Sequence, residues 1–259
     1  MFPIIQIGPI AVQVPGLILL GSLWLGLSLA EKNANKHNID SNHVYNLTLI
    51  TLSSGIVGAR ILYVLRYPGA FAENPLSLIS LNPGLLDPVG GAAVGIVTAL
   101  VYGQLKHMPL FRTLDALVPL FAVLYIGYSF ANTASGNGFG NTTDIPWGLE
   151  AWGTKRHPVQ IYNVIAGIIT LLIVWPNRGP LGNIRTAGVT FFAFLGITAF
   201  SKVILDAFLA SSQVLPFGVR SSQVIAWLLL AISLAAIGWL KHNNRGNDLK
   251  IIQDSKMNK

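Results

Sequence analysis

Cysteine is absent from this 259-residue chain, and charged residues are scarce. Without cysteine there is no disulfide, no thiolate zinc site and no cysteine nucleophile. Only 10% of the residues are charged, against roughly 25% in soluble domains, while 52% are hydrophobic. This composition excludes a disordered chain and argues against a soluble globule. In so apolar a chain, the net charge of +7 indicates contact with a membrane surface rather than with nucleic acid.

Long hydrophobic segments dominate what is present. Seven segments reach or approach the roughly 20 apolar residues that a transmembrane helix needs: 10–30, 44–65, 85–105, 114–131, 159–175, 186–208 and 219–240. We therefore predict an all-α integral membrane protein, a bundle of seven transmembrane helices with a long outer loop between helices 4 and 5. No Lys or Arg precedes the first segment, so we interpret it as a retained helix rather than a signal peptide. Residues 1–240 would form one membrane domain, and 241–259 a basic cytoplasmic tail.

The basic residues outside the segments predict the orientation. With the N-terminus outside, eleven of them lie inside, in loops and tail: Lys32, Lys36, Lys106, Arg112, Arg178, Arg185, Lys241, Arg245, Lys250, Lys256 and Lys259. Only four lie outside, namely Arg66, Lys155, Arg156 and Arg220. We therefore predict an outer N-terminus and a cytoplasmic C-terminus.

Charged side chains within predicted spans point to partners or a cavity. Arg60 precedes Tyr63 and Tyr67 at helical spacing, which places a cation and two phenols on one face. Near the outer end of its span, Arg60 could also simply reach the lipid headgroups. Lys202 and Asp206 are four residues apart and share one helix face, which predicts a pair. The lysine could in addition face a lipid phosphate while the aspartate holds it in place, and both interpretations stand.

The predicted loop between the fourth and fifth spans is rich in glycine and ends on basic residues. Gly136, Gly138 and Gly140 suit tight turns whose backbone N–H groups could cradle an anion. Pro158 suits the first position of the next helix, which makes His157 the N-cap candidate. The positive end of that helix, beside Lys155 and Arg156, could attract a phosphate. The alternative is a basic, capped return into the membrane. In the third span, we interpret the closely spaced glycines as helix packing.

Several motifs together resemble the signature of bacterial prolipoprotein diacylglyceryl transferases. The resemblance covers nearly the whole chain, in the same motif order. It rests on Ile7-Gly8-Pro9-Ile10, Gly58-Ala59-Arg60-Ile61-Leu62-Tyr63, Ile145-Pro146-Trp147-Gly148, Arg156-His157-Pro158-Val159-Gln160-Ile161-Tyr162 and Ser222-Gln223.

The resemblance implies an enzyme that transfers a diacylglyceryl group from phosphatidylglycerol to the lipobox cysteine of a prolipoprotein, in lipoprotein maturation at the outer face of the bacterial plasma membrane. The implied partners are phosphatidylglycerol, the prolipoprotein signal peptide with its lipobox cysteine, and membrane lipid; no metal or cofactor is implied. The nucleophilic thiol belongs to the substrate and must lose its proton. The leaving phosphate must be stabilised by cations or donors.

The resemblance also assigns roles to particular residues. Arg60, Arg156 and Lys202 would hold phosphate or headgroup, while Asn132 and Gln160 would orient lipid oxygens. Asp206 would fix Lys202, and His157 would either take the thiol proton or serve only as a structural cap. The implied catalytic residues are His157, Asn132, Lys202 and Asp206, and the implied substrate-binding residues are Arg60, Tyr63, Gly140, Arg156 and Gln160.

The sequence departs from the family pattern at important positions. Val89 replaces a histidine early in the third span, and Ser129 replaces an arginine in the fourth. Asn137 replaces an acidic residue of the family, and Pro15-Gly16 replaces its Tyr-Gly. Lys202 and Asp206 replace an arginine and a glutamate, so the signs of the two charges are kept. A second hypothesis is therefore a degenerate paralogue that binds lipid or precursor without turnover. A third, a small transporter, is disfavoured because the chain lacks an internal repeat.

Overall fold

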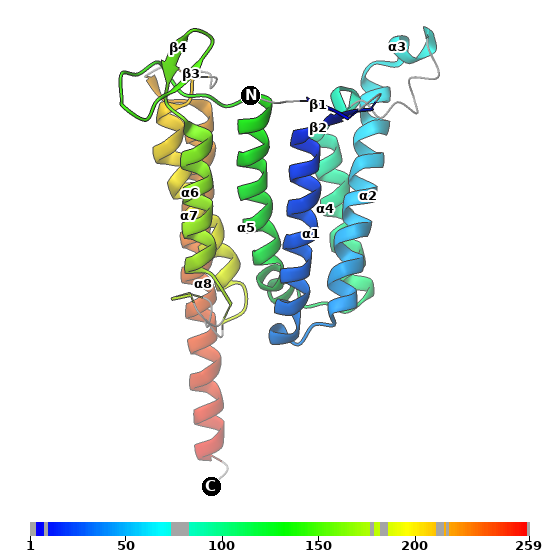
Figure 1. Cartoon of the computed structure of the whole chain (residues 1–259). Coiled ribbons are helices and arrows are strands. Elements are labelled where there is room, and N and C mark those ends of the chain that lie inside the picture. The colour runs from blue at the N-terminus through cyan, green and yellow to red at the C-terminus, as the bar shows by residue number, and fades with distance from the viewer. Residues whose placement is uncertain are drawn as a thin grey trace. The chain divides into compact units, whose positions relative to one another are not determined.

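The computed structural model describes residues 4–7, 10–73, 83–176, 179–181, 186–210, 215 and 218–257. Gly8, Pro9, Arg178, Arg185 and Lys259 lie outside these ranges. The elements in chain order are β1 (Ile4–Ile7), β2 (Ile10–Gln13), α1 (Val14–Ala34), η1 (Asn35–His37), α2 (Ser41–Arg66), α3 (Pro68–Glu73), η3 (Pro83–Leu85), α4 (Pro88–Leu105), α5 (Leu110–Ser135), β3 (Leu149–Ala151), β4 (Thr154–Arg156), α6 (Val159–Ile173), α7 (Val189–Leu205), η4 (Asp206–Phe208) and α8 (Ser221–Met257) (Figure 1).

Each predicted span contains a helix. In the described part of the chain, α1, α2, α4, α5, α7 and α8 are long and apolar enough to cross a membrane. The remaining apolar helix, α6, has 15 residues. The chain is thus an all-α membrane protein, to which two small antiparallel sheets are added. The predicted start of the first span at residue 10 is wrong, because Ile10–Gln13 pairs with Ile4–Ile7 as a strand and α1 begins only at Val14.

The chain divides into two compact units, one of residues 34–113 and the other of residues 1–33 and 114–259. In the smaller unit, α2 packs against α4 through glycines. A Cβ atom on Gly91 would lie 2.7 Å from the Ala59 Cβ and 2.8 Å from the Gly55 carbonyl oxygen. Backbones approach this closely only where side chains are missing, so the interpretation of the span-three glycines as packing residues is confirmed.

In the larger unit, α5 supplies the buried partner for α7. Val118 and Ala122 of α5 pack with Phe194 of α7 in a buried apolar cluster. One turn earlier, the buried Asp115 accepts hydrogen bonds from the backbone N–H groups of Gly188 (2.6 Å) and Phe191 (2.8 Å). A carboxylate of one helix therefore caps the first turn of another. We did not anticipate this contact, which joins residues far apart in the sequence.

The last helix, α8, continues well past its apolar part. Its membrane-length segment ends at Asn244, but the helix runs on to Met257 without a break. In Figure 1 this end of α8 extends beyond α6 and α7, at the opposite end of those helices from β3 and β4. The basic tail expected from residue 241 is therefore helical over its described residues.

Candidate active site

The loop between α5 and α6 is a small sheet rather than an irregular loop. β3 and β4 form a hairpin whose turn residues, Trp152 and Gly153, both have positive φ values, 53° and 73°. This two-residue geometry matches the twist of the strands it joins. The preceding segment adds to β4 through bonds from the Thr143 N–H to the Lys155 carbonyl (2.9 Å) and from the His157 N–H to the Asn141 carbonyl (3.0 Å). These strands were not predicted from the sequence.

The same segment pairs on its other side with the chain that follows η4. The Asn141 N–H donates to the Phe208 carbonyl at 2.7 Å, and the Ala210 N–H donates to the Phe139 carbonyl at 3.1 Å. Gly140 is therefore enclosed: an added Cβ would lie 2.5 Å from the His157 Cβ and 2.8 Å from the Phe208 carbonyl oxygen. Its N–H donates to the His157 carbonyl at 2.9 Å, so this amide is already occupied and does not cradle an anion.

Arg156 and Gln160 both reach back to this segment. The Arg156 Nη1 donates to the Gly140 carbonyl at 3.4 Å, and the guanidinium lies over the Trp152 ring, 5.5 Å from its centroid. The Gln160 Nε2 donates to the Asn137 carbonyl at 2.7 Å. The predicted site residues Gly140, Arg156 and Gln160 thus come together around one short stretch of chain.

The predicted cap of α6 is wrong by one residue. The helix begins at Val159, and Pro158 occupies the N-cap with ψ 65°, outside the helical region, while its carbonyl accepts from the Ile161 N–H at 3.0 Å. His157 does not cap the helix, since its Nδ1 has no hydrogen-bond partner, and its backbone N–H and carbonyl bond to Asn141 and Gly140. Its ring packs instead against Phe208, with 4.9 Å between the ring centroids.

Three buried polar atoms in this region lack a partner. In the described part of the chain, seven buried side-chain atoms have no hydrogen-bond partner, and three of these are Arg156 Nε, His157 Nδ1 and Gln160 Oε1. Burying such groups unsatisfied is costly, and a native structure normally explains each of them. These three atoms lie within five consecutive residues, which makes this stretch the candidate binding position.

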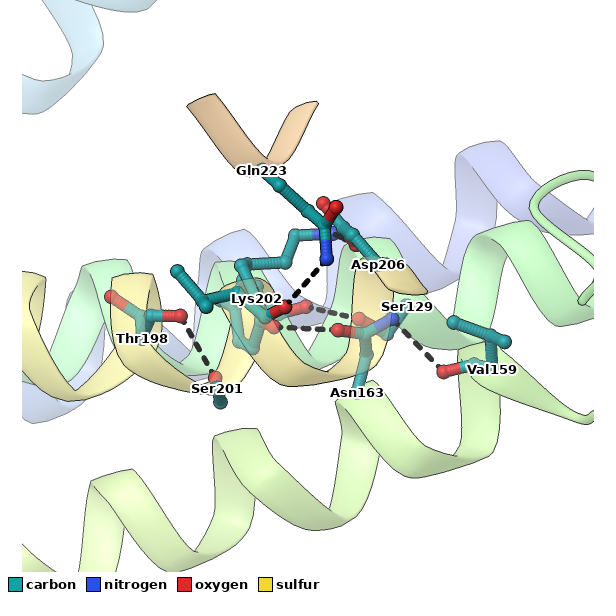
Figure 2. Close-up of polar contacts among 10 residues, drawn as sticks. Ser129, Val159, Asn163, Thr198, Ser201, Lys202, Asp206 and Gln223 are labelled. Atoms are coloured by element: carbon teal, nitrogen blue, oxygen red, sulfur yellow. Dashed lines mark hydrogen bonds and ion pairs between the residues drawn. The ribbon is translucent and has the colours of Figure 1, made fainter. Parts of the chain in front are cut away.

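Lys202 and Asp206 form the predicted pair, with 3.1 Å between the Lys202 Nζ and the Asp206 Oδ1. The Asp206 side chain is only 3% exposed and that of Lys202 36%. Figure 2 draws this pair together with Asn163 and Ser129, and with Gln223 of α8. The Gln223 Nε2 donates to the Val203 carbonyl at 3.0 Å. The pair adjoins the loop, because η4 begins at Asp206 and Phe208 contacts both Asn141 and His157.

Asn163 belongs to this polar region although we did not predict it. Its Nδ2 donates to the Val159 carbonyl at 2.9 Å, and its Oδ1 accepts from the Tyr125 hydroxyl at 2.9 Å. An amide three residues after Gln160 shares its helix face, and that spacing in an otherwise apolar helix was an available signal. Asn132 is linked through the backbone to Asn137, the residue that Gln160 contacts, since the Asn132 carbonyl accepts from the Asn137 N–H at 3.0 Å.

Arg60 and Tyr63 belong to the smaller unit. The Arg60 Nη1 donates to the Leu85 carbonyl at 2.8 Å, and the guanidinium lies 5.9 Å from the Phe71 ring centroid. The rings of Tyr63 and Tyr67 are tilted against each other with centroids 4.9 Å apart, so these two phenols share a face as predicted. Among the residues that the structure describes, no group of three or more His, Asp or Glu side chains could hold a metal ion.

Comparison with known proteins agrees with the motifs. A family model described as prolipoprotein diacylglyceryl transferase matches residues 3–239. The chain therefore belongs to the prolipoprotein diacylglyceryl transferase family, as its motifs predicted.

Three relatives illustrate the similarity, and each is named phosphatidylglycerol–prolipoprotein diacylglyceryl transferase. The protein of Aliivibrio salmonicida is 29% identical over 95% of this chain and 89% of its own length. That of Nostoc sp. is 25% identical over 92% of this chain and 88% of its own length. That of Clostridioides difficile is 24% identical over 90% of this chain and 92% of its own length.

Proposed function

We propose that this chain transfers the diacylglyceryl group of phosphatidylglycerol to the lipobox cysteine of a prolipoprotein, during lipoprotein maturation. Family membership and the names of the relatives support this reaction. A carbon–sulfur bond forms at the glycerol carbon while the carbon–oxygen bond to phosphate breaks. Glycerol phosphate leaves with the bonding electrons, and the thiol proton passes to a base. The protein must therefore hold a phosphate, and it must accept or relay a proton.

The observation that carries the proposal is the group of unpartnered atoms in residues 156–160. Arg156 Nε is a donor, and phosphate oxygens only accept. Gln160 Nε2 is committed to the Asn137 carbonyl, so Oε1 is the remaining acceptor and needs a hydroxyl or N–H donor. The headgroup of phosphatidylglycerol offers both kinds of group, a phosphate and glycerol hydroxyls. His157 Nδ1 lies between them in sequence and is our candidate for the proton acceptor.

The remaining candidate residues support the same chemistry. Lys202, held by Asp206, supplies a second cation to the leaving phosphate. Asn132 orients a lipid oxygen at the end of α5. Further contacts to lipid are assigned to Arg60 and Tyr63, whereas the enclosed Gly140 instead accepts the bond from Arg156.

We also propose the finer architecture. Residues 1–240 form one domain with seven spans, the short α6 included, and residues 241–259 form a basic cytoplasmic tail. The N-terminus and the loop between α5 and α6 face outward from the bacterial plasma membrane. This orientation puts the proposed site on the side where secreted precursors emerge.

Transfer can be measured with purified protein in phosphatidylglycerol nanodiscs and a synthetic lipobox peptide, by mass spectrometry of the thioether product. We expect slow transfer, because Val89 stands where the family has a histidine, and the loss of a general base there would typically cost a factor of 10²–10⁴ in rate. Arg156→Ala and Lys202→Ala should each lower it by a further factor of about 10² or more, because one donor to developing charge is worth roughly 2.7–4 kcal/mol. Lys155→Ala is the matched control: this exposed neighbour should be neutral.

Headgroup recognition gives a second measurement. We expect Gln160→Leu to lower transfer with both donors, because it removes the bond to the Asn137 carbonyl, but to lower it more with phosphatidylglycerol than with a phosphatidylpropanol donor, which has no headgroup hydroxyl. An absent thioether product with retained phosphatidylglycerol binding would favour the degenerate lipid-binding paralogue. Absence of both product and binding would exclude the transferase and the paralogue alike.

The two replaced family residues can be restored singly. Val89 is 79% exposed at the start of α4, so histidine fits there without displacing neighbours, and Val89→His should raise transfer. Ser129 is 4% exposed, and its hydroxyl donates to the Tyr125 carbonyl at 3.0 Å. We therefore expect Ser129→Arg to lower the melting temperature by overpacking. Any gain in transfer rate should then be measured per folded protein.

A further inference from the structure

The hairpin between α5 and α6 carries large apolar side chains in the open. Trp147 is 62% exposed, Trp152 66% and Leu149 38%. Isolated exposed apolar residues are ordinary, but two tryptophans and a leucine within six residues form a patch that needs a partner.

The two faces of the hairpin differ in chemistry. Glu150 pairs across from Lys155, while Leu149 pairs with Arg156 and Ala151 with Thr154. Because successive residues of a strand point to opposite faces, Glu150 and Lys155 share one face and Leu149 and Ala151 the other. The latter face packs on the body of the protein, since Ala151 is 3% exposed. Trp152 lies on this side, with its ring 5.2 Å from that of the buried Phe139, centroid to centroid. Leu149, Ala151 and Trp152 thus lie on the side of the hairpin that faces the rest of the protein. Glu150 and Lys155 lie on the opposite side.

The hairpin is bonded to the first turn of α6. It follows α5, which is long and apolar enough to span a bilayer, and it directly precedes α6. The Trp147 Nε1 donates to the Tyr162 hydroxyl in the first turn of α6 at 2.9 Å. Figure 1 shows β3 and β4 at this end of α6. The body-facing side of the hairpin therefore lies beside the first turn of α6.

We propose that Trp147, Leu149 and Trp152 form an anchoring rim that lies in the interfacial layer of the bilayer, with Glu150 and Lys155 turned to water. Tryptophan suits this layer, because its ring is apolar while its N–H remains polar. A polypeptide arriving from the aqueous side would meet the charged face first, so the bilayer is the partner that this orientation favours. The rim holds residues 156–160, which continue directly from β4, at headgroup depth.

Single cysteines test the rim cleanly, since the chain has no cysteine of its own. Leu149→Cys, Trp152→Cys and Glu150→Cys would carry a nitroxide label in the full-length protein, in nanodiscs of phosphatidylcholine and phosphatidylglycerol. Electron paramagnetic resonance then compares collisions with oxygen, which concentrates in lipid, and with a water-soluble nickel chelate. We expect an oxygen-to-nickel ratio several-fold higher at positions 149 and 152 than at 150, the matched control on the charged face.

Equal ratios at all three positions would overturn the proposal. It would also fail if positions 149 and 152 were protected from nickel only after a lipobox peptide is added, or only at several copies per disc. The first result would make the rim a polypeptide-binding surface, and the second an interface between copies. If Trp152→Cys fails to fold, Leu149→Cys still decides the question, because it leaves both tryptophans in place.

Discussion

At the residue scale, the pair of Lys202 and Asp206 is unequally buried. The carboxylate is 3% exposed and the ammonium-bearing side chain 36%. Removing the lysine strands a buried charge, which costs roughly 3–5 kcal/mol when a buried pair is broken. Removing the aspartate leaves a cation that can still reach solvent or headgroups. We therefore expect Lys202→Met to lower the melting temperature in detergent more than Asp206→Leu does.

The double variant controls for the pairing itself. Lys202→Met with Asp206→Leu replaces both charges by apolar groups of similar size, so it should be more stable than Lys202→Met alone. If the double variant melted at the same temperature as the single lysine variant, the two charges would not be coupled.

At the element scale, the contact between α2 and α4 depends on absent side chains. A methyl group on Gly91 would lie 2.7 Å from the Ala59 Cβ and 2.8 Å from the Gly55 oxygen, so the helices must move apart. We expect Gly91→Ala to destabilise the protein by about 1–3 kcal/mol, the usual cost of overpacking. Thermal unfolding in detergent would measure the change.

Gly103, on the same helix, provides the matched control. A Cβ there meets nothing within 4 Å, so Gly103→Ala should be neutral or stabilising by up to about 1 kcal/mol through helix propensity. Similar losses of stability at both positions would show that the helix, rather than the helix contact, is sensitive to the substitution.

A second prediction at this scale concerns the cap of α7. Asp115→Ala leaves the N–H groups of Gly188 and Phe191 without their acceptor, each worth roughly 1–3 kcal/mol when buried. We expect a large fall in melting temperature, and increased hydrogen exchange at the first turn of α7. Asp144→Ala, which removes an exposed carboxylate, should change neither quantity. A variant of Asp115 with unaltered exchange at α7 would contradict the cap.

At the scale of the whole molecule, orientation is open to a direct test. The basic residues predict a cytoplasmic C-terminus and an outward loop between α5 and α6. With single cysteines placed by Asn141→Cys and Asn247→Cys, a membrane-impermeant thiol reagent on intact cells should label only the first. Labelling of the second alone would reverse the orientation and put residues 156–160 on the cytoplasmic face, where secreted precursors do not emerge.

The sequence by itself was enough to predict the helices and the family. A run of about 20 apolar residues has few alternatives to a membrane helix, because the bilayer offers no hydrogen bonds to an unpaired backbone. The pair of Lys202 and Asp206 was equally predictable, since a spacing of four residues places two side chains together on any helix. The motif around Arg156, His157 and Gln160 indicated both the family and the region of the candidate site.

Only the tertiary structure decided how these parts meet. The enclosure of Gly140 by His157 and Phe208, the Asp115 cap of α7 and the bond from Tyr125 to Asn163 join residues that are far apart in the chain. Hydropathy is a local property and carries no information about which distant backbone groups will pair. For the same reason the hairpin of β3 and β4, and the backbone pairing of His157 with Gly140 and Asn141, followed from the folded chain and not from the spacing of its residues.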